Sequence, residues 1–442
     1  MDIRALCLIS IFFLLFILKL IRSITPSRTK PSPALHLPPG PWQLPLIGSL
    51  HHLLLSRFRD LPHRALREMS KTYGPLMLLR FGSVPHAGGL LRRGRQGAAA
   101  ARASSSPPTA TGGATSARCA CSSSSTSAAC YPSGPSGEEE VERLLRSISG
   151  ECGGGAVVNL GEGICRLAND IVVRTAIGGR CKHRDEFLRG LDEAVRLTGG
   201  FNLADLYPSS RLVRRLSAAA RGTWEGARRR CTVSSRAIID ERAVTRMPER
   251  EEDDLLGVLL RLQRDGGLQF ALTNEIISAV IFDIFAAGSE TSSTVLVWAM
   301  SELVKNPRVL QKAQSEEALR MHAPVPFLLP RECRQTCQVM GYDVPKGTKV
   351  FVNVWAIGRD NRSWGDGEVF KPERFDGRRI CPGITHGLAN MELVLASLLY
   401  HFDWELPGGA GELDMTEAFG ITLRRKTQLM LKAKPRIKFV SK

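Results

Sequence analysis

The sequence Gly377-Arg-Arg-Ile-Cys-Pro-Gly383 places one cysteine, Cys381, between a basic run and a Pro-Gly turn. The apolar segment from Leu388 to Tyr400 follows it and predicts a helix. A thiolate at the start of a helix is stabilised by unpaired backbone N–H groups and by the helix dipole, and Arg378 and Arg379 add positive charge beside it. The stretch therefore favours an anionic sulfur that binds a metal. A reduced, buried cysteine in an ordinary loop is the alternative.

The loop resembles the haem-binding loop of the cytochrome P-450 family, the haem-thiolate monooxygenases, whose pattern is Phe-x-x-Gly-x-Arg-x-Cys-x-Gly. Gly377, Arg379, Cys381 and Gly383 occupy the Gly, Arg, Cys and Gly positions, whereas Arg374 stands where the family has Phe. The resemblance implies that Cys381 is the axial ligand of the iron in haem b (iron protoporphyrin IX). It also implies that Arg379 pairs with a haem propionate.

A second motif lies in a long apolar segment that Thr273 opens as a helix N-cap. Its middle, Phe285-Ala-Ala-Gly-Ser-Glu-Thr-Ser292, holds small residues that would let a flat cofactor approach, and an acid beside a hydroxyl that can relay protons. The alternative is a small-residue helix-packing site with an incidental polar pair. The run resembles the family's oxygen-activation motif, which implies that Glu290 and Thr291 are catalytic and that Ala287 lines the substrate pocket.

Three charged residues form a third family pattern. Glu317 and Arg320 lie three residues apart, which alone would be a surface pair worth about 0.3 kcal/mol. The spacing resembles the family's Glu-x-x-Arg motif, and its usual third partner corresponds to Arg374 in the sequence Pro-Glu-Arg-Phe. The resemblance implies a buried structural cluster of Glu317, Arg320 and Arg374 that is costly to break.

The resemblance also assigns the remaining site residues. Arg331 is similar to an arginine that pairs with the second haem propionate in the family. Two stretches, 323–327 and 419–422, match segments that usually line the substrate pocket. They contribute Val325, Phe327 and Ile421 as expected pocket residues.

The N-terminal segment predicts a membrane anchor. Residues 5–18 are almost purely apolar and basic residues follow, so the bulk of the chain should stay on the cytosolic side. We expect residues 1–22 to be an uncleaved anchor and residues 23–45 to be a basic, proline-rich hinge, similar to that of microsomal family members. A removed signal peptide is the alternative. The resemblance then implies the endoplasmic reticulum membrane, with the catalytic domain, residues 46–442, facing the cytosol.

The net charge indicates which classes of partner the chain binds, and the cysteines indicate its redox compartment. The formal net charge of +17 favours an anionic membrane lipid surface or an acidic protein partner, and the sequence has no nucleic-acid-binding motif, so we expect no nucleic acid. Eleven cysteines are scattered along the chain. Cys333 and Cys337 lack further Cys or His ligands nearby, as do Cys119 and Cys121, and we interpret them as free thiols in a reducing compartment.

Residues 86–137 break the pattern of a folded domain. They contain no Asp, Glu, Ile, Val or Phe and are rich in Ala, Gly and Ser, so we expect disorder. A flexible insert is one interpretation, and a frame-shifted translation of GC-rich coding sequence fits better. Two joints, 316–317 and 375–377, also bring family motifs directly together where members have intervening segments.

Local patterns predict further elements. Leu76 to Phe81 has strand character, residues 157–200 predict two helices around Gly178-Gly179, and residues 211–250 predict a basic helical stretch. Together with the resemblance, they imply a mainly α fold with a small β region, a cytochrome P-450-like fold that is incomplete.

The implied function is haem-dependent insertion of one oxygen atom from O2 into a small hydrophobic specialised metabolite. Electrons would come from NADPH through a flavoprotein reductase. The alternative is a catalytically inactive, membrane-tethered product of a damaged gene or a faulty gene model.

Overall fold

The structure is a computed structural model, and its described residues form two compact units. It describes residues 35–89, 104–105, 135–151, 156–178, 183–198, 203–244, 254–265, 271–306, 315–362, 364–370, 384–407 and 413–437. The described parts of unit 1 fall within residues 1–107, 200–223 and 327–357. Those of unit 2 fall within residues 108–199, 224–326 and 358–442.

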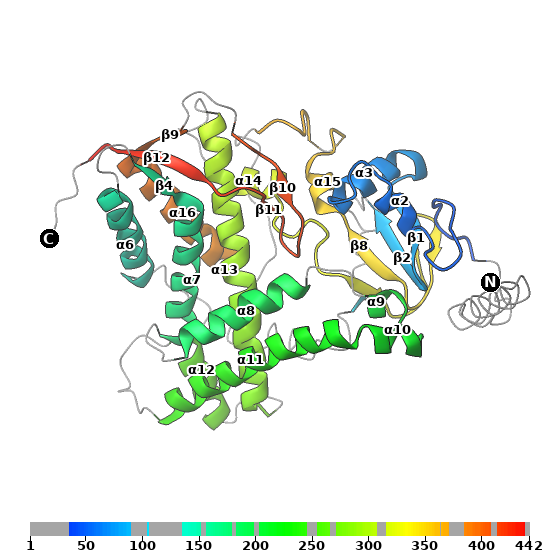
Figure 1. The fold of residues 1–442 in the computed structure, drawn as a ribbon, viewed down its shortest axis with the longest axis horizontal. Coiled ribbons are helices and arrows are strands. Elements are labelled where there is room, and N and C mark those ends of the chain that lie inside the picture. The colour runs from blue at the N-terminus through cyan, green and yellow to red at the C-terminus, as the bar shows by residue number, and fades with distance from the viewer. Residues whose placement is uncertain are drawn as a thin grey trace, which may run out of the picture. The chain divides into compact units, whose positions relative to one another are not determined.

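Unit 1 is built around a small mixed sheet (Figure 1). The strand order is β1-β2-β8-β5-β3; β2 and β8 pair in parallel and the other neighbours are antiparallel. A separate hairpin joins β6 and β7. The elements are α2 (Leu50–Leu54), α3 (Pro62–Tyr73), β1 (Leu76–Phe81), β2 (Val84–Gly89), β3 (Ser104–Ser105), α9 (Leu203–Leu206), α10 (Arg211–Leu216), β5 (Arg331–Cys333), β6 (Cys337–Val339), β7 (Tyr342–Val344) and β8 (Lys349–Val352).

Strand β1 has the bounds that its apolar pattern predicts. Its neighbour β2 shows where a prediction is wrong, because residues 86–89 fall in the segment expected to be disordered yet pair with β1 and β8. Ser104–Ser105 likewise pairs with β5. Backbone pairing with neighbouring strands satisfies N–H and C=O groups whatever the side chains, so composition alone misplaced this boundary.

Unit 2 holds most of the helices. Its elements are α6 (Pro135–Glu151), β4 (Val157–Asn159), α7 (Leu160–Ile177), α8 (Arg184–Thr198), α12 (Leu255–Asp265), α13 (Asn274–Lys305), α14 (Ser315–Met321), α16 (Ile384–His401), β9 (Phe402–Glu405), β10 (Glu417–Ala418), β11 (Arg424–Arg425) and β12 (Met430–Pro435). Strands β4, β12 and β9 form one antiparallel sheet, and β10 pairs with β11. Helices α11 (Ala218–Val244) and α15 (Val354–Gly358) carry the chain from one unit to the other.

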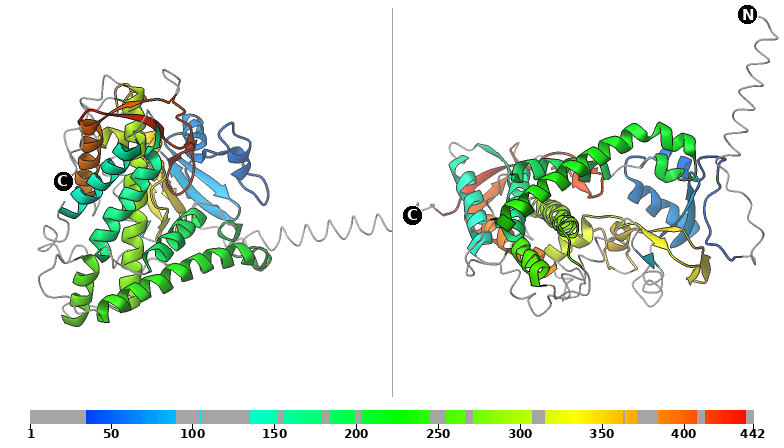
Figure 2. Two further views of the ribbon diagram at one scale, coloured as in Figure 1. Left: turned by 60° about the vertical axis from the view of Figure 1, so that its left-hand side comes forward. Right: turned by 90° about the horizontal axis from the view of Figure 1, so that it is seen from below.

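Helix α13 is the central helix of unit 2. Thr273 caps it as predicted, because its hydroxyl accepts a hydrogen bond from the N–H of Ile276. The helix is apolar on most of its surface, and residues on several of its faces are buried. Figure 2 (right) looks nearly along α13, with the other helices of unit 2 around it.

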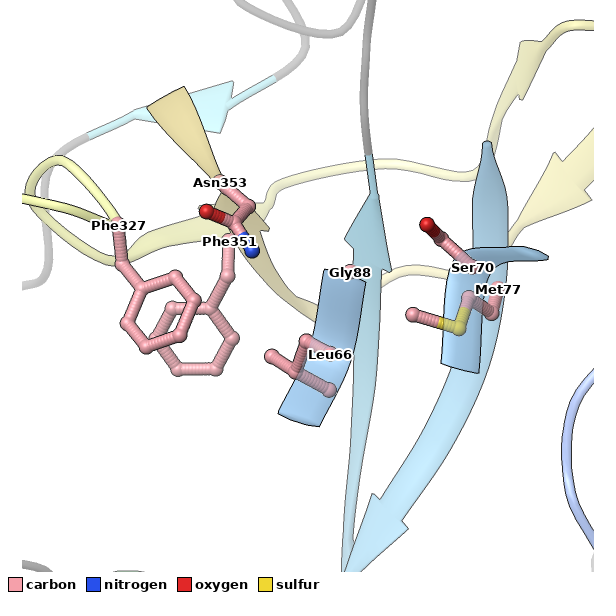
Figure 3. A pocket seen from close by; sticks show the side chains of 7 residues that line it. All are labelled: Leu66, Ser70, Met77, Gly88, Phe327, Phe351 and Asn353. Atoms are coloured by element: carbon pink, nitrogen blue, oxygen red, sulfur yellow. The ribbon is translucent and has the colours of Figure 1, made fainter. Parts of the chain in front are cut away.

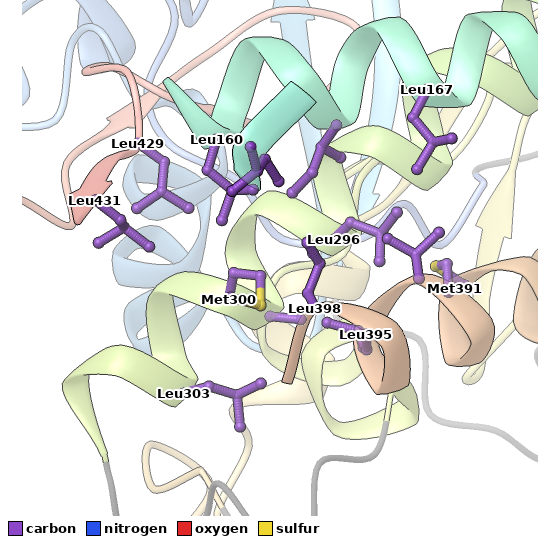
Figure 4. Close-up of a cluster of buried hydrophobic side chains, with 14 of the residues drawn as sticks. Leu160, Leu167, Leu296, Met300, Leu303, Met391, Leu395, Leu398, Leu429 and Leu431 are labelled. Carbon is purple, nitrogen blue, oxygen red and sulfur yellow. The ribbon is translucent and has the colours of Figure 1, made fainter. Parts of the chain in front are cut away.

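One large apolar cluster holds unit 2 together (Figure 4). It joins Leu160 of α7 and Met300 of α13, both fully buried, to Leu395 of α16 and Leu431 of β12. Burying a side chain of this size contributes about 1.5–3 kcal/mol. Helix α16 therefore forms as the apolar run after the cysteine loop predicts.

Helix α7 ends where the sequence predicts. Asn159 caps its start by accepting from the N–H of Glu162, and Gly178 ends it in the left-handed conformation, at φ 75°. Helix α8 then begins the second of the two expected helices. The expected fold class, mainly α with a small β region, is confirmed.

Among the described residues, one helix is long and apolar enough to cross a membrane, and it is α13. Since α13 packs against α7, α14 and α16 inside unit 2, it is a core helix. The expected anchor, residues 1–22, lies outside the described residues.

Candidate active site

The small residues in the middle of α13 face two different environments. A methyl group added at Gly288 would lie 3.2 Å from a methyl carbon of Val172 on α7, so glycine here allows two helices to pack closely. Ala287, one residue earlier, is exposed. The helix-packing alternative therefore holds at Gly288, and Ala287 is the small residue that leaves one face of α13 open.

The Glu290 carboxylate is held by two residues near the C-terminus. Thr422 Oγ1 donates to Glu290 Oε1 at 2.5 Å, and Arg424 Nη2 donates to Oε2 at 2.5 Å. Arg424 Nε also donates to Oε1, which makes the ion pair bidentate. This fork is the geometry in which an arginine binds a carboxylate most strongly. Glu290 is thus a fixed, paired carboxylate and not a free acid on the helix surface.

The Thr291 hydroxyl has a different partner. Its Oγ1 donates to the carbonyl oxygen of Ala287, one turn earlier in the same helix. Such bonds satisfy the hydroxyl within the helix and can bend it. Glu290 and Thr291 are adjacent in sequence, but only Glu290 is tied to another element.

Two expected pocket-lining stretches meet beside α13. The N–H of Leu423 donates to the carbonyl oxygen of Pro324 at 2.8 Å, and Trp298 Nε1 of α13 donates to the carbonyl oxygen of Leu423 at 2.9 Å. Val325 and Ile421 flank this contact and are half-buried. The stretches that carry Val325 and Ile421 therefore meet beside α13, and their role in lining a substrate pocket with Ala287 stays a prediction.

Phe327, the fourth expected pocket residue, lines a small hollow inside unit 1 (Figure 3). The hollow encloses about 230 Å³, which includes space open to solvent. The ring centroids of Phe327 and Phe351 are 5.9 Å apart. The lining residues are mostly apolar: Leu66, Ser70, Met77, Gly88, Phe327, Phe351 and Asn353.

Arg320 is buried, as the Glu-x-x-Arg motif predicts. Its guanidinium donates to the carbonyl oxygens of Gly358, Gly367 and Val369, and it lies 5.4 Å from the ring of Trp364. The side chain of Glu317 and the whole of Arg374 lie outside the described residues, so the three-residue cluster stays a prediction.

A buried polar network that the sequence analysis missed lies at the C-terminal half of α13. His322 Nε2 lies 2.7 Å from Glu302 Oε1, and the His322 ring stacks on Trp298 at 4.2 Å. Burial lowers the pKa of His322, and this effect outweighs that of the hydrogen bond that the Glu302 carboxylate accepts from its ring. Burial would raise the pKa of Glu302, but the His322 hydrogen bond and nearby cations hold it below its usual value. The pair is therefore a neutral imidazole and a carboxylate.

Arg331 lies on β5, where its backbone pairs with Val350 of β8. Its side chain is half-exposed, and no acidic partner is found for it among the residues that the structure describes. Cys381 and Arg379 fall in the stretch 371–383, outside those residues. Helix α16 begins at Ile384, directly after Gly383, so the helix that should follow the cysteine loop is in place.

Comparison with known proteins identifies the family. The cytochrome P450 family model matches residues 134–316 and 315–432. Ent-isokaurene C2/C3-hydroxylase of Oryza sativa subsp. japonica is 41% identical over 495 aligned positions, which cover 94% of this chain and 94% of that protein. Zealexin A1 synthase of Zea mays is 38% identical over 473 positions, which cover 90% of this chain and 92% of that protein.

The same comparisons show that the chain is shorter than its relatives. Alignments of 473 and 495 positions exceed the 442 residues of this chain, so these relatives carry residues without a counterpart here. The family match starts at residue 134 and divides at 315–316, next to the joint predicted at 316–317. Its second part runs across 375–377 without a break. The chain belongs to the cytochrome P450 family of haem-thiolate oxidoreductases, and the fold is incomplete relative to its plant relatives.

Proposed function

We propose that this chain derives from a haem-dependent monooxygenase that inserts one oxygen atom from O2 into a small hydrophobic specialised metabolite. The observation that carries the proposal is the middle of α13, where Ala287 leaves one face open while Glu290 is fixed by Thr422 and Arg424. Relatives named ent-isokaurene C2/C3-hydroxylase and ent-cassadiene hydroxylase support a hydrophobic substrate and a hydroxylation reaction.

The sequence offers residues whose chemistry suits a haem. Cys381 offers the soft thiolate that iron accepts as an axial ligand, and it precedes the N-terminus of α16. Arg331, which has no acidic partner among the described residues, and Arg379 would pair with the propionates. When bound, the haem supplies the activation of O2, and the protein supplies ligation, orientation and a site that excludes water.

In this proposal Glu290 and Thr291 deliver protons. The arginine fork holds the Glu290 side chain in one position next to Thr291, where it can take part in a proton relay to the open face of α13. Thr422 and Arg424 are then positioning residues, and Thr291 supplies the hydroxyl on the open side of the helix.

Members of the family generally take electrons from a redox partner, and plant members are typically bound to the endoplasmic reticulum membrane. For this chain we propose NADPH as the electron source through a flavoprotein reductase. Residues 1–22 would anchor the chain in membrane lipid, with the catalytic domain facing the cytosol. The net charge of +17 suits an acidic reductase surface.

The ligand assignment is tested by the spectrum of the reduced carbon monoxide complex. A thiolate-bound haem gives a red-shifted Soret band, and we expect Cys381→Ala to abolish it. Cys165→Ala and Cys231→Ala are matched controls that should retain it. An unchanged band in Cys381→Ala would reject the assignment.

The alternative is that the chain has no catalytic function and is the product of a damaged gene or a faulty gene model. The family match that starts only at residue 134 and divides at 315–316 favours it, as do relatives that are longer than this chain. Expression of this sequence beside a version with residues 86–137 and both joints restored from the genomic locus separates the two. Haem and NADPH-dependent product from the restored version alone would support the inactive product, and stoichiometric haem with turnover from this chain would overturn it.

A further inference from the structure

Two cysteine sulfurs lie next to each other in unit 1, outside every site described above. Cys333 ends β5, Cys337 begins β6, and their Sγ atoms are 3.6 Å apart. Cys333 is only 2% exposed, whereas Cys337 is half-buried. The Cys333 thiol donates to the carbonyl oxygen of Gln335 at 2.9 Å, within the short connection between the two strands.

The backbone fixes both positions. The N–H of Cys333 donates to the carbonyl oxygen of Thr348 at 2.9 Å, and the N–H of Gly347 donates to the carbonyl oxygen of Cys333 at 2.8 Å. Cys337 pairs with Val344 in the β6–β7 hairpin. Strand pairing therefore fixes the backbone positions of both cysteines, and their side chains bring the two sulfurs to 3.6 Å from each other.

The ordinary interpretation is apolar packing, since Cys333 belongs to a small cluster with Val339, Val344 and Val350. Packing alone does not require two thiols to face each other. A disulfide needs its sulfurs at about 2.05 Å, so a further approach of about 1.5 Å would be enough. Rotation about the side-chain bonds of the half-buried Cys337 can supply this approach while the backbone stays paired.

We propose that Cys333 and Cys337 are a modification site at which hydrogen peroxide forms an intramolecular disulfide. Peroxide oxidises the Cys337 thiol to a sulfenic acid and leaves as water. The Cys333 sulfur then attacks the Cys337 sulfur and displaces a second water, so two thiols and one peroxide give one disulfide and two waters. Two electrons pass from the sulfurs to the peroxide.

The order of the two steps follows from the surroundings. Burial raises the pKa of Cys333 to about 11, and the neighbouring Cys337 thiol acts in the same direction. The thiolate is the form that attacks peroxide. Cys337 is the more accessible of the two sulfurs, so it reacts first and Cys333 resolves. Cys333 lies two residues beyond Arg331 on β5, so the cross-link would fix the end of the strand that carries this candidate propionate partner.

The test uses the full chain and does not depend on haem or turnover. The reduced protein is exposed to graded hydrogen peroxide, its free thiols are alkylated and it is digested with trypsin. Trypsin cuts after Arg331, Arg334 and Lys346, which places the two cysteines in separate peptides, 332–334 and 335–346. We expect these peptides to appear joined, two hydrogens lighter than their sum, and to separate on reduction.

Two variants sharpen the result. Cys337→Ser should abolish the joined peptides, and Cys231→Ser, at another buried free thiol, should leave their yield unchanged. Separate alkylated peptides at peroxide doses that already oxidise Cys165, which is exposed, would overturn the proposal. Further oxidation of Cys337 to a sulfinic acid without the cross-link would also overturn it, because it would show that Cys333 cannot resolve.

Discussion

The C-terminal half of α13 and the middle of the same helix hold their polar residues in different ways. In the C-terminal half, Trp298, Ser301 and Glu302 are buried, and each has a partner on another element: Leu423, Arg425 and His322. In the middle of the helix, Ala287 is exposed and the Thr291 hydroxyl bonds only within its own helix. Amino-acid composition does not distinguish these two parts of the helix, since both contain apolar and hydroxyl residues. Their partners distinguish them. The polar residues of the C-terminal half are fixed within the core, whereas the middle presents Ala287 and Thr291 next to Glu290, which Thr422 and Arg424 hold in place.

The largest effect that this comparison predicts is on stability. His322→Ala should lower the free energy of unfolding by roughly 1–3 kcal/mol, because Oε1 of the buried Glu302 carboxylate loses its donor while Asn306 Nδ2 still donates to Oε2. It also removes the ring that stacks on Trp298. Urea unfolding followed by circular dichroism measures the loss. Thr291→Ala, in the middle of the same helix, is the control and should change the free energy of unfolding by less than about 1 kcal/mol.

A loss below about 1 kcal/mol in His322→Ala would contradict the structural role. It would place the C-terminal half of α13 in the same class as the middle and remove the contrast between them.

The same pair predicts a dependence of stability on pH. Burial lowers the pKa of folded His322 below its ordinary 6.5, so the unfolded chain binds a proton that the folded chain does not. This contribution is fully present above pH 6.5 and is lost as the pH falls through the folded pKa. The lowered pKa of Glu302 acts in the same direction below pH 4.5.

Unfolding midpoints measured between pH 8 and pH 5 test this dependence. We expect a fall on acidification that is shallower in His322→Gln, which cannot titrate. His86 of β2 provides a background in the same range, since burial lowers its pKa to about 4, but it is common to both proteins. Equal slopes in the parent and His322→Gln would show that His322 does not control the acid sensitivity.

The sequence predicted those features that depend on neighbours along the chain. The Thr273 cap, the strand from Leu76 to Phe81 and the helix after the cysteine loop are encoded by local patterns, and all three are observed. The burial of Arg320 was also expected from its motif. Local hydrogen bonds and apolar periodicity are enough to specify such elements.

The partners of the site residues could not be predicted in this way. Glu290 and Arg424 are 134 residues apart, and Glu302 and His322 are 20 apart, so no spacing rule connects them. Arg424 and Arg425 are adjacent in sequence, yet Arg424 binds Glu290 and Arg425 binds Ser301, which lies farther along the same helix α13. Only tertiary structure decides which arginine meets which partner.

The arginine fork predicts a change in coupling with little change in stability. Arg424 is about half-exposed, so Arg424→Ala should cost less than about 1 kcal/mol. In a chain with the missing regions restored, it should raise the peroxide formed per NADPH and change the pH profile of turnover, since Glu290 loses its fixed position and charge partner. Arg424→Lys keeps the positive charge but cannot make the bidentate contact. The peroxide that it forms per NADPH should lie between the values for the restored parent and for Arg424→Ala. Lys426→Ala, an exposed cation two residues away, should match the parent.

An unaltered pH profile in Arg424→Ala would mean that the pair only stabilises the loop that carries Thr422. In that case Glu290 would have a structural role, as the buried polar residues in the C-terminal half of α13 do.

The smallest structural change, and the most specific one, is Thr291→Ala. Among the described residues its hydroxyl bonds to the carbonyl oxygen of Ala287 alone, and alanine is the better helix former, so haem binding, substrate binding and stability should be retained. Proton delivery by a positioned group contributes typically 10²–10⁴-fold, and water or the neighbouring Ser292 hydroxyl can replace part of it. We therefore expect roughly a tenfold fall in product per NADPH, with the missing electrons recovered as hydrogen peroxide. Thr291→Ser, which restores a hydroxyl at the same position, should recover most of the coupling. Equal product per NADPH in Thr291→Ala and the restored parent would remove Thr291 from the mechanism and leave Glu290 as the only proton-delivering side chain of α13.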